Sequence, residues 1–310
     1  MVILAGSPRG GEKTWKSLFK YVVDHLNADL AICTTDNFVS KNILFEKANY
    51  KWIMENPVNF ENYYSKNYTG NWKEYLSKGK GLGLYESGMI HFALKDYIKR
   101  EHIKTLNNYE YIIYSRFDQY YIDYHPDVNQ DKLYIPNGED YFGICDRHAV
   151  LKSKKAEKFL SIIEYIDKKT TINDLPKYPN CESVYKKHLV HIDFLKDVER
   201  YQRISFTAAI KNEPTNWRVP TYKIFLSNKL MIKYPDEFLT AFEEKYLKKS
   251  FLKYLLEDYP LNLYFIYIKL RRRLGEIFKK KPHLVCEEHG DFFLSDRYKN
   301  LEKGCPECGT

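Results

Sequence analysis

The sequence predicts an α/β protein whose main domain is a mostly parallel sheet with helices on both faces. The first observation is a strand, a glycine-rich turn, a helix and a second strand in succession over residues 2–33. The second is that strand-like and helix-like segments keep alternating to about residue 210, as parallel sheets require. The third is that 44% of the 310 residues are apolar, which is enough for a sizeable core.

The opening segment has the pattern β-loop-α-β. Residues 2–5 form a short apolar strand, residues 6–11 form a turn with three glycines, and residues 14–27 carry apolar side chains at helical spacing. A second strand is expected at residues 30–33. Because helix amino termini attract anions, the turn and the helix predict an anion site at the start of the sheet.

The middle of the chain is less regular. Residues 37–82 are polar and aromatic, and we expect them to form a long irregular excursion over the active face. The alternation then resumes, and the expected elements are helices at 84–104 and 153–168 and strands at 111–114, 134–135 and 141–145.

The pattern changes after Pro220. Two helices are expected, at residues 235–258 and 261–281, with Pro260 marking the break between them. The predicted domains are a main domain at 1–220, a helical extension at 221–282 and a small unit at 283–310.

An arginine and an aspartate follow the apolar strand at residues 111–114. Strands of α/β proteins deliver ligand-binding residues at their carboxyl ends, so Arg116 and Asp118 are expected to face one crevice. An Asp oxygen is a ligand suited to Mg²⁺ or Mn²⁺, and a guanidinium neutralises phosphate oxygens. The pair therefore predicts a site for a metal-bound diphosphate, and the alternative is an ion pair at the strand end.

Four metal-ligand residues occupy the last 25 positions. Cys286-x-x-His289 and Cys305-x-x-Cys308 have the spacing of a tetrahedral zinc site with no open position, which makes the metal structural rather than catalytic. The segment resembles the zinc ribbons appended to phage and other viral proteins. Because Glu287 and Glu288 lie in the first knuckle, we favour a capping or protein-docking role over DNA contact.

The helix expected at 261–281 is basic, with seven Lys and Arg against one acid, and has an apolar side. This combination is typical of a helix that lies on an anionic membrane surface, and the apolar side favours lipid over nucleic acid. The alternative is a solvated face packed on the main domain. No apolar run is long enough to span a bilayer, so we expect a cytoplasmic protein, in the host cytoplasm if viral, with peripheral membrane contact.

Residues 1–200 resemble the viral and bacterial glycosyltransferases of the GT-A type. Gly6, Pro8 and Arg9 match the nucleotide-side loop of that family. Arg116-Phe117-Asp118 stands where the family has its Asp-x-Asp metal motif, so a divalent cation would rest on Asp118. Residues 142–147 resemble the Gly-Gly-x-x-Asp-Arg segment near donor and acceptor, which places Arg147 at the donor.

The resemblance implies transfer of a sugar from a nucleotide-sugar donor to a hydroxyl of a glycan, a lipid-linked or a protein acceptor. The enzyme must stabilise the diphosphate leaving group, for which Arg9, Arg116 and Asp118 are candidates. An inverting enzyme also needs a carboxylate base, and Asp146 is the first candidate and Glu182 the second. The alternative role of Asp146 is a local salt bridge.

Two other functions stay open at this point. The turn at Pro8-Arg9-Gly10-Gly11 resembles the phosphate loop of sulfotransferases, but one extra residue precedes Thr14. The same turn is one residue too long for a nucleoside-triphosphate loop. The second alternative to a glycosyltransferase, after the sulfotransferase, is a non-enzymatic, nucleic-acid-binding ribbon protein.

Overall fold

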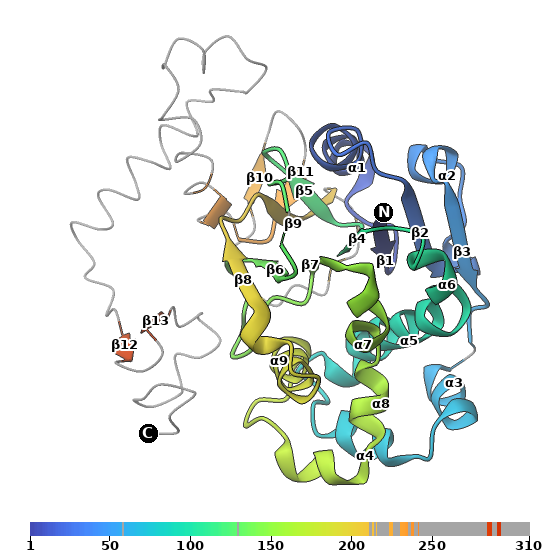
Figure 1. Cartoon of the computed structure of the whole chain (residues 1–310), viewed down its shortest axis with the longest axis vertical. Helices are drawn as coiled ribbons and strands as arrows, with labels where there is room; N and C mark the ends of the chain where they lie inside the picture. The colour runs from blue at the N-terminus through green and yellow to red at the C-terminus, as the bar shows by residue number, and fades with distance from the viewer. Residues whose placement is uncertain are drawn as a thin grey trace. The chain divides into compact units, whose positions relative to one another are not determined.

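The computed structural model describes residues 1–210 other than 58 and 129, together with 213, 215, 223–225, 230–234, 237, 238, 241, 284–286 and 290–292. The chain divides into two compact units, Met1–Glu213 and Pro214–Thr310. The first unit contains a mixed α/β fold (Figure 1).

A seven-stranded sheet forms the centre of the first unit. Its order is β3-β2-β1-β4-β7-β6-β8. Strand β7 runs antiparallel to β4 and β6, and every other neighbouring pair is parallel, so the predicted mostly parallel sheet is confirmed. The strands are β1 (Val2–Ala5), β2 (Leu30–Thr35), β3 (Tyr50–Met54), β4 (Tyr111–Ser115), β6 (Leu133–Pro136), β7 (His148–Lys152) and β8 (Val198–Tyr201).

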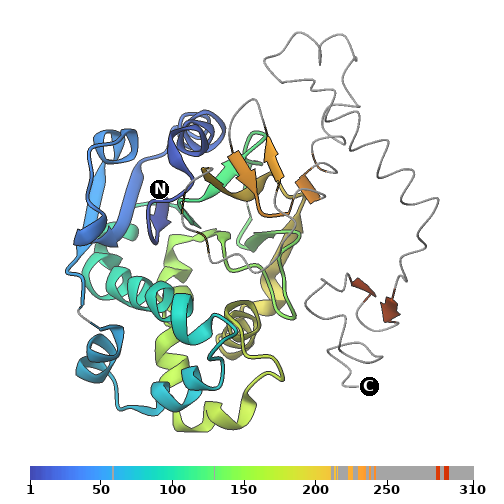
Figure 2. The same ribbon diagram turned by 180° about the vertical axis from the view of Figure 1, so that it is seen from behind.

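Helices cover both faces of the sheet. They are α1 (Gly11–Leu18), α2 (Ile43–Lys47), α3 (Phe60–Asn67), α4 (Asn71–Ser77), α5 (Met89–Tyr97), α6 (Ile103–Leu106), α7 (Ala156–Leu160), α8 (Ile162–Asp167) and α9 (Cys181–His191). One group contains α1 and α2, and the other contains α5, α7, α8 and α9. The two groups lie apart in both views (Figure 1, Figure 2). The helix predicted at 84–104 is a helical run of η3 (Leu84–Gly88), α5, η4 (Ile98–His102) and α6, with π-helical turns on either side of α5.

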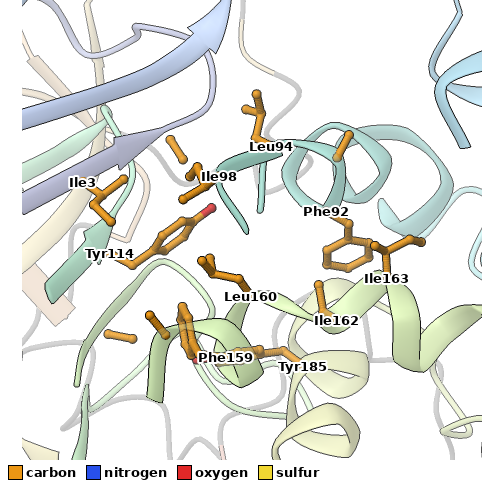
Figure 3. Packing of buried hydrophobic residues seen from close by; sticks show 14 of the residues in the cluster. Ile3, Phe92, Leu94, Ile98, Tyr114, Phe159, Leu160, Ile162, Ile163 and Tyr185 are labelled. Atoms are coloured by element: carbon orange, nitrogen blue, oxygen red, sulfur yellow. The ribbon is translucent and has the colours of Figure 1, made fainter. Parts of the chain in front are cut away.

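Alternation along β1 explains the two layers. Val2 and Leu4 pack in a core with α1 and α2, whereas Ile3 and Ala5 pack in a larger core with α5, α7, α8 and α9. Every β1 residue is fully buried because both faces are covered. Figure 3 shows the larger core, in which Tyr114 lies among side chains from α5, η4 and α7.

Two sequence predictions of local structure are wrong. Residues 37–82 are not an irregular excursion, because they contain β3, α2, α3 and α4. Their aromatic side chains supply the core face, as Tyr64 and Trp72 are fully buried. Residues 141–145 are not a strand: Tyr141 and Phe142 have φ angles of 43° and 68°, so the backbone turns there.

The remaining described strands are short. In the first unit β5 (Gln119–Tyr121) pairs antiparallel with β9 (Ser205–Ile210). In the second unit β10 (Lys223–Phe225) pairs with β11 (Leu230–Ile232), and β12 (Leu284–Cys286) with β13 (Gly290–Phe292). The helix predicted at 261–281 and the residues His289, Cys305 and Cys308 lie outside the described residues, as does nearly all of 235–258. Among the residues described, no helix is long and apolar enough to cross a membrane.

A chain of buried polar side chains lies beside β4. His125 Nδ1 donates to the carbonyl of Pro126 at 2.8 Å, so its Nε2 is an acceptor for Nε2 of His148 at 3.1 Å. Nδ1 of His148 then accepts from the hydroxyl of Ser115 at 3.2 Å or of Tyr121 at 3.3 Å. Burial lowers the pKa of His148 well below its usual range and that of His125 to about 4. Both rings are therefore neutral in the folded protein.

We expect this arrangement to make the fold sensitive to acid. The pKa of His125 is 6.5 when it is unperturbed and about 4 in the fold. The neutral His125 ring makes its full contribution to the free energy of unfolding above pH 6.5. At pH 5 the free energy of unfolding is lower by about 2 kcal/mol from this cause. Urea unfolding at pH 7 and pH 5 should show a smaller difference in His125→Asn than in the wild type. The exposed-residue control His25→Asn should keep most of the difference, because the charge of His25 is a smaller cause of the lowered pKa of His125 than burial is. An unchanged difference in His125→Asn would contradict the argument.

Candidate functional site

The site lies where the direction of strand order reverses. Strand β1 is paired with β2 on one side and with β4 on the other, and all three are parallel. Ligands of open α/β sheets bind at the carboxyl ends of the strands at such a point. The structure places Gly6, Ser7 and Arg9 after β1, and Arg116 to Asp118 after β4, around one hollow.

The hollow is small and partly open. It is lined by the residues after β1 and β4 and by Ser87, Ile90 and His91 of the helical run, and Pro8 sits in the turn that forms one wall. Its volume is about 40 Å³, which is roughly three times the space that one water molecule needs. A phosphate-sized group matches this volume, and the rest of a nucleotide would lie outside it.

Arg116 and Asp118 form the ion pair considered from the sequence. Nε donates to Oδ1 at 3.1 Å and Nη2 to Oδ2 at 2.8 Å, so the pair is bidentate. Burial alone would raise the pKa of Asp118, but the guanidinium of Arg116, assisted by Arg147 and Arg9, outweighs burial and lowers the pKa. Asp118 is therefore ionised and bound to a cation of the chain itself.

These contacts oppose the binding of the predicted Mn²⁺ or Mg²⁺ at Asp118. Both oxygens of Asp118 accept from Arg116, so a metal ion would have to displace the guanidinium. In the described part of the chain no three His, Cys, Asp or Glu side chains form a group that could hold a metal. As arranged here, these donors do not fit a divalent-cation centre, and metal binding at Asp118 stays a prediction.

Arg9 lines the hollow without a carboxylate partner. Its carbonyl accepts from Nε1 of Trp15 at 3.0 Å, which fixes the turn against α1. Among the described residues no acidic side chain lies within ion-pair distance of its guanidinium, although Arg9 contributes to the low pKa of Asp118. Arg9 is thus a cation at the hollow that forms no ion pair with any described residue.

The amino terminus of α1 is bound by an acid of the chain. The N–H of Gly10 donates to both carboxylate oxygens of Glu213, at 3.1 and 3.0 Å. Burial raises the pKa of Glu213, and Asp118 adds to the shift. The anion position that the sequence predicted at this helix start is therefore occupied by Glu213, and the hollow lies beside it.

A buried ion cluster centred on Arg147 holds the two candidate bases. Its guanidinium lies 2.7 Å from Glu139, 2.8 Å from Glu182 and 3.3 Å from Asp146. Arg147 thereby compensates the negative charge of Glu182, which lies in the first turn of α9. Burial would raise the pKa of Asp146, but Arg147 and then Arg116 outweigh it and lower the pKa. Asp146 is therefore ionised, as a base must be. It also forms a salt bridge with Arg147, which is the alternative role considered from the sequence.

The loop before Asp146 is pressed onto the start of α9. Glu139, Tyr141 and Phe142 all have positive φ angles. The N–H of Ile144 donates to the carbonyl of Glu182 at 3.2 Å. A Cβ on Gly143 would lie 2.1 Å from the carbonyl carbon and oxygen of Glu182. Only glycine allows this approach, which places Asp146 and Glu182 around one guanidinium.

Helix α5 brings polar residues that the sequence analysis missed. Ser87, His91 and Lys95 are spaced by four residues and so share one side of the helical run. His91 lines the hollow. Lys95 is 3% exposed, and burial lowers its pKa to about 8. Its ammonium lies 4.6–4.9 Å from the ring centres of three aromatic residues, Tyr114, Phe159 and Tyr185. The four-residue spacing of these three polar residues was the signal available.

The two histidines of α9 stay outside this group. His188 is fully buried in the core, and His191 is bonded to Lys168 at 2.7 Å. Comparison of the sequence with known proteins gives no match to a family model and none to a curated protein.

We expect Gly143→Ala to destabilise the fold strongly. The new methyl group would collide with backbone atoms of Glu182, which cannot move aside, so the free energy of unfolding should fall by about 3 kcal/mol or more. Gly81→Ala is the matched control, because its Cβ meets nothing within 4 Å and only its φ of +78° opposes the change. The control should lose about 1 kcal/mol. Equal losses in urea unfolding would contradict the packing argument.

Proposed function

We propose that the chain is a glycosyltransferase that moves a sugar from a nucleotide-sugar donor to a hydroxyl acceptor. The observation that carries the proposal is the hollow at the carboxyl ends of β1 and β4, where Arg9 and Arg116 face a phosphate-sized space. Asp146, an ionised carboxylate, lies within electrostatic reach of Arg116. The arrangement supplies the two groups that such a transfer needs.

The residues have separate tasks in this reaction. The guanidinium of Arg9, together with that of Arg116, stabilises the negative charge that develops on the diphosphate as its bond to the sugar breaks. Asp146 takes the proton of the acceptor hydroxyl as the new bond to the sugar forms, which is the role of the base in an inverting transfer. Glu182, held by Arg147, positions that guanidinium beside Asp146.

We further propose that this glycosyltransferase is of the GT-A type. This assignment is supported by the mostly parallel sheet and by the position of Gly6, Pro8 and Arg9 in the turn after β1. The acceptor is proposed to be a glycan, a lipid-linked or a protein hydroxyl, reached in the cytoplasm or at a membrane surface through residues 261–281. A sulfotransferase is less well supported, because Glu213 holds the amide that a phosphate loop would offer. A purely nucleic-acid-binding protein would have no use for the buried cluster of Arg147.

We expect Arg9→Met to weaken the binding of a nucleoside diphosphate roughly 10- to 100-fold, the value of one charge-assisted contact. Titration calorimetry with UDP and GDP measures the effect, with adenosine 3′,5′-bisphosphate added to detect a sulfotransferase site. Lys13→Met is the control, because it removes the same charge from an exposed residue of α1. Binding of the bisphosphate but neither diphosphate, or equal effects of the two variants, would refute the assignment.

We also propose that Cys286, His289, Cys305 and Cys308 hold one structural zinc ion. Cys286 is the last residue of β12 and pairs with Gly290, the first residue of β13. Elemental analysis should find one zinc per chain, lost in Cys305→Ser and kept in Cys181→Ser, whose cysteine belongs to α9. UDP or GDP binding should survive the loss of zinc, and a zinc content that depends on Cys181 would contradict the assignment.

A further inference from the structure

His91 faces the hollow from the helix side. It lies on α5 and lines the hollow together with Arg9, Arg116 and Asp118. Its ring reaches the turn after β1, because a Cβ built on Gly6 would lie 3.4 Å from Cε1 of His91. The imidazole therefore stands against the backbone of Gly6 and forms one wall of the candidate site.

The imidazole is neutral under all ordinary conditions. Burial lowers its pKa to about 3, and the neighbouring cation of Arg116 is the next cause. The charges of Asp146 and Asp118 act in the opposite direction, and Lys95, one turn along α5, adds to the lowering of the pKa. A neutral imidazole offers one N–H donor and one nitrogen acceptor.

Neither nitrogen of His91 makes a hydrogen bond within the described part of the chain. The side chain is only partly buried and lines the hollow, so its donor and its acceptor are open to a bound molecule. The two guanidiniums of the site suit phosphate oxygens, whereas a neutral donor–acceptor pair suits a hydroxyl group.

We propose that His91 binds a hydroxyl group of the transferred sugar and so distinguishes a nucleotide sugar from the nucleoside diphosphate. This inference rests on the proposed function. In a transfer reaction the sugar lies between the diphosphate and the base. His91 lines the hollow together with Arg116, on the phosphate side, and the charge of Asp146, the proposed base, also acts on its ring, as expected for a residue beside the transferred group.

The test compares two ligands on the full-length protein. Affinities for UDP and UDP-glucose, and for GDP and GDP-mannose, are measured by titration calorimetry on wild type, His91→Ala and His91→Gln. His91→Ala should weaken the nucleotide sugar about 5- to 10-fold, the value of one hydrogen bond, and change the diphosphate less than twofold. His91→Gln, which keeps a donor and an acceptor, should recover most of the loss. The exposed-residue variant His25→Ala should match the wild type.

The outcomes separate the two proposals. A wild type that binds no diphosphate and no nucleotide sugar refutes the proposed function and His91's role with it. A wild type that binds both, combined with equal losses for both ligands in His91→Ala, refutes the role of His91 alone. The advantage of nucleotide sugar over diphosphate should also stay constant from pH 5.5 to 8, because the ring does not titrate there. A decline of that advantage toward pH 5.5 would overturn the inference.

Discussion

The parallel pairing of β1 with β4 is the constraint on which the site depends. Leu4 is paired with Ser115, so the two strands end side by side and their next residues leave the sheet together. Gly6 and Arg9 come from one strand end, and Arg116 and Asp118 from the other, more than 100 positions along the chain. A slip of one residue in this pairing would turn every side chain to the opposite face. Because both strands are buried on both faces, the two cores prevent such a slip.

Charge compensation is the second requirement. Burying a charged group is costly unless a partner and hydrogen bonds accompany it. Arg147 meets this requirement with three carboxylates, and Arg116 meets it with Asp118. Arginine guanidiniums stay charged at every pH of interest, whereas burial lowers the pKa of His91 to about 3 and keeps its imidazole neutral near pH 7. The site therefore combines permanent cations, ionised carboxylates and a neutral ring, and under the proposed function each would contact a different part of a nucleotide sugar.

The sequence predicted the parts of the site that follow from strand periodicity. Apolar runs at residues 2–5 and 111–114 marked β1 and β4, and the parallel sheet then placed Arg9 and Asp118 at one edge. Contacts between distant residues could not be predicted in this way. Glu213 binds an amide 203 positions away, and no local pattern records that contact. The left-handed backbone at Tyr141 has no signal in residue type either, which is why a strand was expected there. Tyrosine and tryptophan are amphipathic, so the pattern of residues 60–77 predicted a polar loop although their aromatic side chains form a buried face.

The charges around the hollow also determine how an anion would enter it. Glu213 occupies the amide at the start of α1, so the helix terminus offers less to a phosphate than its position in the fold implies. Arg116 is already bound to Asp118 by two hydrogen bonds, and a diphosphate that recruits it must share or replace that carboxylate. Arg9 has no such competitor among the described residues. Contact with Arg9 therefore costs no existing ion pair, whereas the contribution of Arg116 is reduced by the interaction it gives up. Under the proposed function a diphosphate would therefore gain more from Arg9 than from Arg116, although Arg116 belongs to the motif from which the site was predicted.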